Sequence, residues 1–161
     1  MNPKKVLFVC LGNICRSPAA EAVMNDLIEK NNLTEKIKVD SAGIIAYHEG
    51  EKADSRMINA AEERGYKVTS IARKFNPQKD FDEFDYIITM DDENFEELNS
   101  LDSRSKFKNK IYKMISFLNQ YEVNEVPDPY YGGRNSFDFV LDLLEDATKG
   151  LLKKIEEDDT R

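Results

Sequence analysis

The amino-acid sequence predicts an α/β fold in which a four-stranded parallel β-sheet is flanked by helices on both faces. Short apolar runs alternate with segments of helical periodicity, in the order βαβαβαβα. Strands of one sheet that are joined through helices run parallel, and their crossovers are right-handed. The length of 161 residues suits one domain with a sizeable core, so we expect residues 1–161 to form a single domain.

The first strand is followed closely by the first helix. Residues 5–10, "KVLFVC", form an apolar run that is typical of a strand buried on both faces. From Ser17 onwards, apolar residues recur at helical spacing, and Pro18 suits the first turn of a helix.

A second strand and helix are expected in the next part of the chain. Residues 37–43, "IKVDSAG", predict a strand that ends in a loop. Asp54 or Ser55 then caps a helix that runs through Arg64, and Gly65 ends it.

Two further strands and two helices complete the pattern. Residues 85–90, "DYIITM", predict the third strand, and a helix begins after it at Asp91 or Asp92. Residues 110–118, "KIYKMISFL", predict the fourth strand. The last helix shows one apolar stripe, formed by Phe137, Val140, Leu144, Ala147, Leu151 and Ile155.

Composition and charge exclude several classes of function. The net charge of −8, from 23 basic and 31 acidic residues, argues against a nucleic-acid partner. One histidine and two cysteines exclude a structural zinc site, and we expect no metal and no cofactor. No apolar stretch approaches the length of a membrane span, and the start "MNPKKVLFVCLGN" lacks the cleavage site of a signal peptide. We therefore expect a cytoplasmic protein without a membrane partner.

The loop "CLGNICRS", residues 10–17, has the composition of an oxyanion-binding loop. Gly12 and Asn13 tolerate left-handed backbone dihedrals, so the chain can curl with successive N–H groups pointing inward. The helix that follows adds its positive N-terminal end, and Arg16 can donate two parallel hydrogen bonds to an anion. The hydrophobic residues Leu11 and Ile14 suit the lining of a pocket for an aromatic ring.

Cys10 is the candidate nucleophile, because it ends a buried strand at the centre of this loop. A helix N-terminus and a neighbouring guanidinium stabilise a thiolate, which faces a bound phosphate in line for attack. The alternative is a buried structural thiol beside an incidental surface arginine. Cys15 is close enough in a curled loop for a disulfide, and we predict reversible Cys10–Cys15 oxidation. Alternatively, Cys15 is a small loop residue without a redox role.

Asp128 is the candidate general acid and base. It lies in "PDPYYGG", where prolines on both sides stiffen its backbone, and it precedes the last helix. In parallel sheets ligands bind at the carboxyl ends of the strands, and we expect Cys10 and Asp128 to meet at that edge. The alternative is a turn aspartate between two prolines.

"VCLGNICRSP" followed late in the chain by "DPYYGG" resembles the low-molecular-weight protein tyrosine phosphatases. The segments "VDSAGI" (39–44), "IAR" (71–73) and "DFDEFDYIITMD" (80–91) follow in that family's order. The resemblance implies a four-stranded parallel sheet, Cys10 as nucleophile, Arg16 as phosphate ligand and Asp128 as general acid, without a metal.

The same resemblance assigns further residues by position. It gives loop-supporting or phosphate-loop positions to Asn13, Ser17 and Ser41, and aromatic substrate-flanking positions to Tyr47, Tyr130 and Tyr131. One departure concerns residues 70 and 71, where the family often has a histidine before "AR" and this chain has Ser70 and Ile71.

The implied reaction is hydrolysis of phosphotyrosine, in a protein or a small aryl phosphate, through a cysteinyl-phosphate. Relatives that act on protein phosphoarginine carry threonine in place of Ile14, which instead favours a flat phenol ring. Arsenate reduction on the same fold needs further cysteines than the two present. A non-catalytic phosphate-binding module would not need both Cys10 and Asp128. We expect a monomer or a weak dimer.

Overall fold

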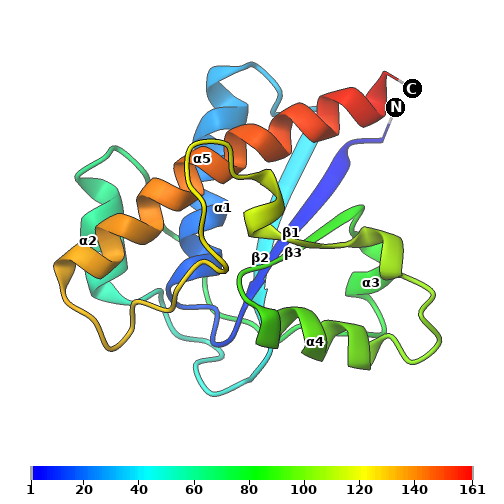
Figure 1. Cartoon of the computed structure of the whole chain (residues 1–161), viewed down its shortest axis with the longest axis horizontal. Helices are drawn as coiled ribbons and strands as arrows, with labels where there is room; N and C mark the ends of the chain where they lie inside the picture. Colours follow the sequence, from blue (N-terminus) through cyan, green and yellow to red (C-terminus); the bar gives the residue numbers. More distant parts are fainter. Residues whose placement is uncertain (1, 161) are drawn as a thin grey trace.

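A parallel sheet with strand order β2-β1-β3-β4 forms the centre of the molecule (Figure 1). The computed structural model describes residues 2–160. Its strands are β1 (Lys4–Cys10), β2 (Ile37–Gly43), β3 (Tyr86–Thr89) and β4 (Ile111–Lys113). Val6 of β1 lies opposite Val39 of β2 and Tyr86 of β3, and all three strand pairs are parallel, as predicted.

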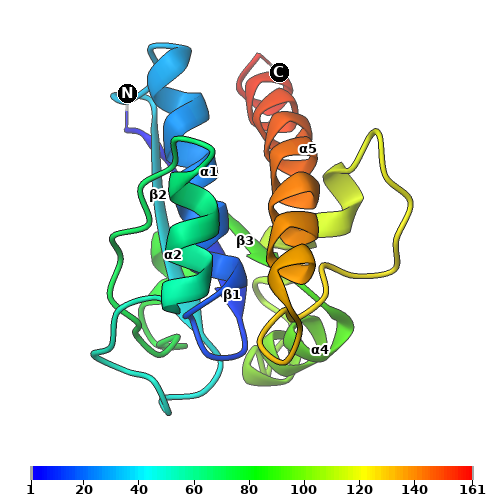
Figure 2. The ribbon, with the colours of Figure 1, turned by 90° about the vertical axis from the view of Figure 1, so that its left-hand side faces the viewer.

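Helices cover both faces of this sheet, which also confirms the prediction. They are α1 (Arg16–Lys30), α2 (Ser55–Glu62), α3 (Asp80–Glu83), α4 (Asp92–Leu101) and α5 (Arg134–Asp159). On one face α1, α2 and α5 pack together, and α5 runs beside α1 (Figures 1 and 2). On the other face α3 and α4 cover a smaller apolar cluster. None of the helices within residues 2–160 is long and apolar enough to cross a membrane.

The central strand β1 divides its side chains between the two faces. Val6 and Phe8 belong to the cluster under α1 and α5, whereas Leu7 and Val9 belong to the cluster under α4. All four side chains are fully buried, because successive residues of a strand point to opposite faces and both faces are covered. Cys10 therefore ends a strand that the core holds on both sides.

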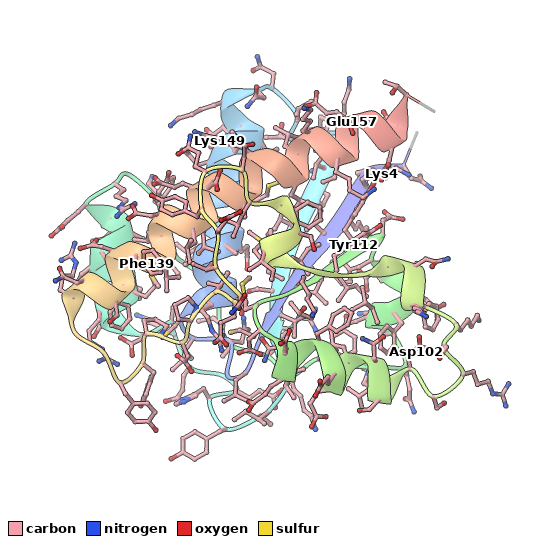
Figure 3. The ribbon with its side chains drawn as sticks, viewed as in Figure 1. Lys4, Asp102, Tyr112, Phe139, Lys149 and Glu157 are labelled. Atoms are coloured by element: carbon pink, nitrogen blue, oxygen red, sulfur yellow. The ribbon has the colours of Figure 1, made fainter. Side chains whose placement is uncertain are left out.

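Two predicted helix starts rest on side-chain caps. The carboxylate of Asp54 accepts a hydrogen bond from the N–H of Arg56 (2.8 Å), and that of Asp91 accepts one from Asn94 (2.8 Å). Asp102, which is labelled in Figure 3, lies at the other end of α4. Its carboxylate accepts hydrogen bonds from the N–H groups of Lys106 (2.9 Å) and Phe107 (2.8 Å). The short helix α3 has no counterpart in the sequence prediction.

The prediction of a strand over residues 110–118 is wrong in its extent. Strand β4 covers three residues, and short 3-10 helices, Lys108–Lys110 and Met114–Phe117, precede and follow it. The chain leaves the sheet because α5 offers other partners. Asp146 accepts hydrogen bonds from the N–H groups of Asn119 (3.0 Å) and Gln120 (2.9 Å). Gly150 leaves room for the Phe117 carbonyl, which would lie 2.1 Å from a Cβ at that position.

Candidate active site

The loop between β1 and α1 is anchored through its carbonyl groups. The carbonyls of Cys10 and Leu11 accept hydrogen bonds from the N–H groups of Ile44 and Ile45 (both 3.0 Å). The carbonyl of Ile14 accepts from the N–H of Asp54 (2.8 Å). Within residues 2–160, the N–H groups of residues 11–17 donate to no protein acceptor. A fixed loop with free amide donors at a helix N-terminus has the properties of an oxyanion cradle.

Asn13 holds the loop in its curled form. Its φ of 58° lies in the left-handed region, which asparagine tolerates better than most residues. Its Nδ2 donates to Ser17 Oγ (2.8 Å) and Ser41 Oγ (3.0 Å), and its Oδ1 accepts from the N–H of Arg73 (3.0 Å). The three residues predicted as polar supports, Asn13, Ser17 and Ser41, therefore form one buried network behind the loop.

This network ends at Glu21, which the sequence analysis did not identify. Ser41 Oγ donates to Glu21 Oε1 (2.6 Å), so the serine oxygen is oriented to accept from Asn13. Burial raises the pKa of Glu21, the hydrogen bond from Ser41 opposes the rise, and Asp40 adds to it. A hydrogen bond from the Ser70 side chain to the same carboxyl group also acts to lower the pKa of Glu21. No local sequence signal identified Glu21, because its partner Ser41 lies 20 positions further along the chain, on β2.

Glu21→Gln is expected to change how stability depends on pH. Because the folded protein holds the Glu21 proton more tightly than the unfolded chain, the contribution of Glu21 to wild-type stability decreases as pH rises above its ordinary pKa of 4.5. Glutamine keeps the acceptor for Ser41 and carries no proton to lose. Urea unfolding between about pH 4 and 8 should therefore show the variant gaining stability relative to wild type as pH rises.

The exposed Glu29 on the same helix supplies a matched control. Glu29→Gln should leave the difference from wild type unchanged over this pH range. A Glu21→Gln difference that stays constant or falls with rising pH would contradict the assignment.

Cys10 lies at the floor of the site, with its Sγ 3.0 Å from Ser17 Oγ. Ser17 Oγ accepts from Asn13 Nδ2 (2.8 Å), so the Ser17 hydroxyl can donate its own proton to the sulfur or to the carbonyl of Ala42 (3.5 Å). The network from Glu21 therefore reaches the sulfur of the candidate nucleophile.

Arg16 is buried beside this sulfur and is held by two groups from distant segments. Its Nη1 donates to Asp91 (2.7 Å) and to the carbonyl of Val126 (2.9 Å). Burial lowers the pKa of Arg16, but the charges of Cys10 and Asp91 outweigh this and raise it overall. Within residues 2–160, Nε and Nη2 donate no hydrogen bond, so one edge of the guanidinium remains for an anion. Asp91, which also caps α4, was not predicted as a site residue.

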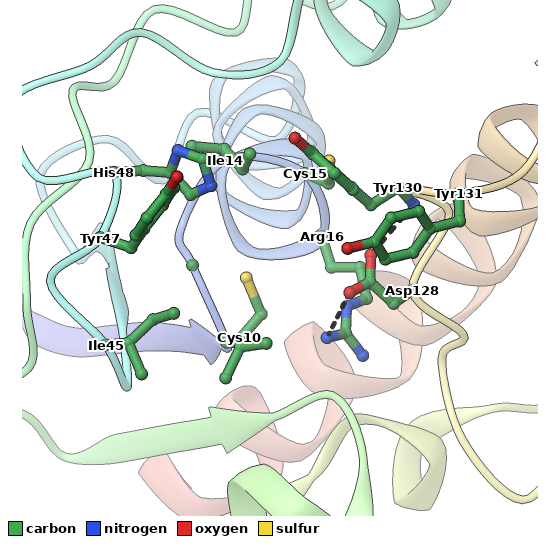
Figure 4. Close-up of a pocket in the computed structure, with 12 residues that line it drawn as sticks. Cys10, Ile14, Cys15, Arg16, Ile45, Tyr47, His48, Asp128, Tyr130 and Tyr131 are labelled. Atoms are coloured by element: carbon green, nitrogen blue, oxygen red, sulfur yellow. Dashed lines mark hydrogen bonds and ion pairs between the residues drawn. The ribbon is translucent and has the colours of Figure 1, made fainter.

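The candidate site is a pocket of about 320 Å³ around these groups (Figure 4). Its lining includes ten of the residues predicted from the sequence: Cys10, Leu11, Gly12, Ile14, Cys15, Arg16, Tyr47, Asp128, Tyr130 and Tyr131. Asn13, Ser17 and Ser41 do not line it, because they support the loop from behind. Ile45 and His48 also line the pocket and were not predicted as site residues.

Tyrosines stand on opposite rims of the pocket (Figure 4). Tyr47 and Tyr131 are 83% and 95% exposed, so neither is a core residue. Tyr47 packs edge-on against His48, with ring centroids 4.8 Å apart, and Tyr130 packs in the same way against Tyr131 at 5.0 Å. The guanidinium of Arg56 lies 5.3 Å from the Tyr130 ring centroid. These contacts position two aromatic walls above Cys10.

Asp128 lies at the mouth of the pocket. Its Oδ1 accepts a hydrogen bond from the N–H of Tyr130 (3.1 Å), and its Oδ2 is 3.8 Å from Arg16 Nη2. The side chain is 43% exposed, so it can reach a substrate oxygen and a water molecule. Its position matches the geometry that a general acid needs.

Cys15 is the second thiol of the pocket, and both cysteines are free. Burial, followed by the charges of Asp54 and Cys10, raises the pKa of Cys15 well above its ordinary value. The Cys15 thiol is therefore neutral. The candidate nucleophile Cys10 and the neutral Cys15 thiol therefore line the same pocket.

Known proteins share both the sequence and this structure. The family model described as "Low molecular weight phosphotyrosine protein phosphatase" matches residues 5–161. The low molecular weight protein-tyrosine-phosphatase YfkJ of Bacillus subtilis is 40% identical over 155 residues, which cover 95% of this chain and 96% of that protein.

Solved structures agree over almost the whole chain. The protein tyrosine phosphatase of Entamoeba histolytica is 52% identical, with a TM-score of 0.93, covering 97% of this chain and 99% of that one. A Drosophila arginine phosphatase is 33% identical with a TM-score of 0.86, covering 94% of this chain and 97% of that one. Together with the family match, these similarities show that the chain belongs to the low molecular weight phosphotyrosine protein phosphatases, which are phosphoric monoester hydrolases.

Proposed function

We propose that this enzyme hydrolyses phosphotyrosine through a cysteinyl-phosphate on Cys10. The observation that supports this most strongly is the anchored loop of free N–H groups around Cys10, closed by the free edge of Arg16. Three phosphate oxygens fit such donors, and the phosphorus then faces the sulfur.

The first step forms an S–P bond and breaks the ester bond. The Cys10 thiolate attacks phosphorus, and the departing phenolic oxygen takes a proton from the Asp128 carboxylic acid. The Arg16 guanidinium and the loop N–H groups stabilise the charge on the three equatorial oxygens during this transfer.

The second step regenerates the enzyme. A water molecule attacks the phosphorus of the cysteinyl-phosphate, and the Asp128 carboxylate now takes a proton from that water. The S–P bond breaks, inorganic phosphate leaves, and Cys10 returns to the thiolate. Asp128 therefore gives up one proton in the first step and regains one in the second.

Selection of phosphotyrosine is attributed to the apolar and aromatic lining. Leu11, Ile14 and Ile45 line the pocket with apolar side chains that a bound ring would contact, and tyrosines stand on its opposite rims. A flat phenol ring buries apolar surface there, whereas a phosphoserine methylene is too small to do so. A phosphoarginine guanidinium would place polar N–H groups against Ile14.

Phosphopeptides of one sequence that carry phosphotyrosine, phosphoserine or phosphoarginine test this selection. We expect kcat/KM to be highest for phosphotyrosine. Faster turnover of phosphoarginine would instead support the arginine-phosphatase alternative, for which the Drosophila enzyme is a structural neighbour. The cytoplasmic location and the monomeric or weakly dimeric state stay predictions.

Cys15→Ser is expected to recover less activity than wild type after treatment with peroxide followed by dithiothreitol. Peroxide converts the Cys10 thiolate to a sulfenic acid, and the Cys15 thiol displaces water from it to form a disulfide. Dithiothreitol then reduces this disulfide to two thiols. Without Cys15, the sulfenic acid is oxidised further to forms that dithiothreitol cannot reduce. Aryl phosphate turnover before and after the cycle measures this, and equal recovery would overturn the protective role.

A further inference from the structure

A groove next to the substrate pocket shares part of its lining. The groove has a volume of about 430 Å³ and lies between residues 44–45 and α4. Leu11 and Ile45 line both the pocket and the groove, and each is 41% exposed. The remaining groove residues are Ile44, Glu93, Asn94, Glu96, Glu97 and Ser100. A ligand bound over Cys10 can therefore extend past Leu11 into this groove.

The far wall of the groove is acidic and has no internal counter-charge. Glu93, Glu96 and Glu97 are exposed on α4 and, at spacings of three and four residues, share one face of the helix. Within residues 2–160, none of the three lies within 4.0 Å of a lysine, arginine or histidine nitrogen, and the groove lining contains no lysine or arginine. By contrast, acids of α5 such as Asp142 and Glu145 pair with Arg64.

The acidic wall continues around Leu11. A smaller hollow of about 270 Å³ is lined by Leu11, Arg16, Asp91, Asp92, Glu93, Glu125 and Asp128. The one cation in its lining, Arg16, is opposed by Asp91 and Asp128, and Asp92 pairs with Lys113 (2.8 Å) from outside the lining. A cationic side chain next to the bound phosphotyrosine would therefore lie near carboxylates in the groove and in the smaller hollow.

We propose that this groove binds the polypeptide segment next to the phosphotyrosine, and that Glu93, Glu96 and Glu97 select a lysine or arginine in it. The floor of Leu11, Ile44 and Ile45 matches the aliphatic stem of such a side chain, and the acidic wall matches its charged end. Because the groove is continuous with the substrate pocket, one ligand can place its phosphotyrosine in the pocket and its basic residue in the groove. The proposal rests on the proposed function, and it makes the substrate a phosphotyrosyl polypeptide with basic flanking residues.

Peptides that carry lysine, alanine or glutamate at each of the three positions before and after the phosphotyrosine test the proposal. We expect lysine to raise kcat/KM over alanine by about three- to tenfold at its best position, as for one or two partly exposed ion pairs. Glutamate should lower it. About 0.5 M salt should reduce the preference, because screening weakens exposed pairs. Equal turnover of all peptides would overturn the proposal and assign the site to small aryl phosphates.

Two variants with the same change in net charge distinguish an effect of the groove residues from an effect of the overall charge of the protein. The triple variant Glu93→Gln, Glu96→Gln, Glu97→Gln should lose the lysine preference. The control variant Glu29→Gln, Glu62→Gln, Glu156→Gln changes exposed acids on α1, α2 and α5, which cover the opposite face of the sheet, and should keep it. Loss of the preference in both variants would overturn a specific role of α4.

Charge reversal sharpens the test. Glu93→Lys with Glu97→Lys should invert the preference toward glutamate peptides, and lysine is as good a helix former as glutamate. All variants should turn over p-nitrophenyl phosphate at the wild-type rate, since it has no flanking residues; a matching loss there would overturn the proposal in favour of a structural role. If the wild type turned over no aryl phosphate at all, the proposed function itself would fail.

Discussion

Cys10→Ser is expected to lower kcat for aryl phosphates by at least about 10⁴-fold, as removal of a catalytic nucleophile does in other enzymes. A serine hydroxyl at the end of β1 would remain within reach of Ser17. It would stay protonated, however, and a protonated hydroxyl is a far weaker nucleophile than a thiolate. The remaining donors, the loop N–H groups and Arg16, would still bind the phosphate. Turnover of p-nitrophenyl phosphate without added metal measures the effect.

Binding of inorganic phosphate is the control for Cys10→Ser. Calorimetric titration should show affinity within severalfold of wild type, because the cradle does not depend on the sulfur. Activity within tenfold of wild type would show that Cys10 is not the nucleophile. Loss of both phosphate binding and activity would point to a collapsed loop, which Cys10→Ala would then distinguish by restoring binding.

Asp128→Asn is expected to slow hydrolysis by about 10²- to 10³-fold for a poor leaving group, within the usual range for general acid catalysis. The amide cannot donate the proton that the departing oxygen needs. Phenyl phosphate should therefore be affected strongly, and p-nitrophenyl phosphate much less, because p-nitrophenolate leaves without protonation.

The exposed Asp82 on α3 supplies a charge-matched control. Asp82→Asn should leave both substrates at wild-type rates. A small loss of equal size for both substrates in Asp128→Asn would mean that another acid protonates the leaving group. Asp91 would be the next candidate, since it also contacts Arg16.

Most of the fold was predictable because its signals are local. Strand β1 ends in an unbroken apolar run, residues 6–10, and α5 shows a single apolar stripe from Phe137 to Ile155. The end of the fourth strand was not predictable, because Met114 and Phe117 are buried apolar residues and such residues suit a strand and a 3-10 helix equally well. Asp146 and Gly150, both on α5, decide where the chain leaves the sheet.

The candidate site divides in the same way. Cys10 and Arg16 are six positions apart, so the strand, the loop and the helix that follow one another along the chain bring them together. Asp128 could be predicted from its motif and from the expected edge of the sheet. Asp91 and Glu21 could not, because their roles exist only once α4 and β2 lie beside the loop.

The sequence by itself determined the candidate catalytic loop, because consecutive residues supply its candidate nucleophile, its curl and its cation. Tertiary structure decided how the loop is held and what lies beside it. The carbonyls of the loop find their donors at residues 44, 45 and 54, and Arg16 finds Asp91 and Val126. The acidic groove likewise exists because the fold sets α4 against residues 44–45. Such contacts join segments that are far apart along the chain, and no local pattern of residues encodes them.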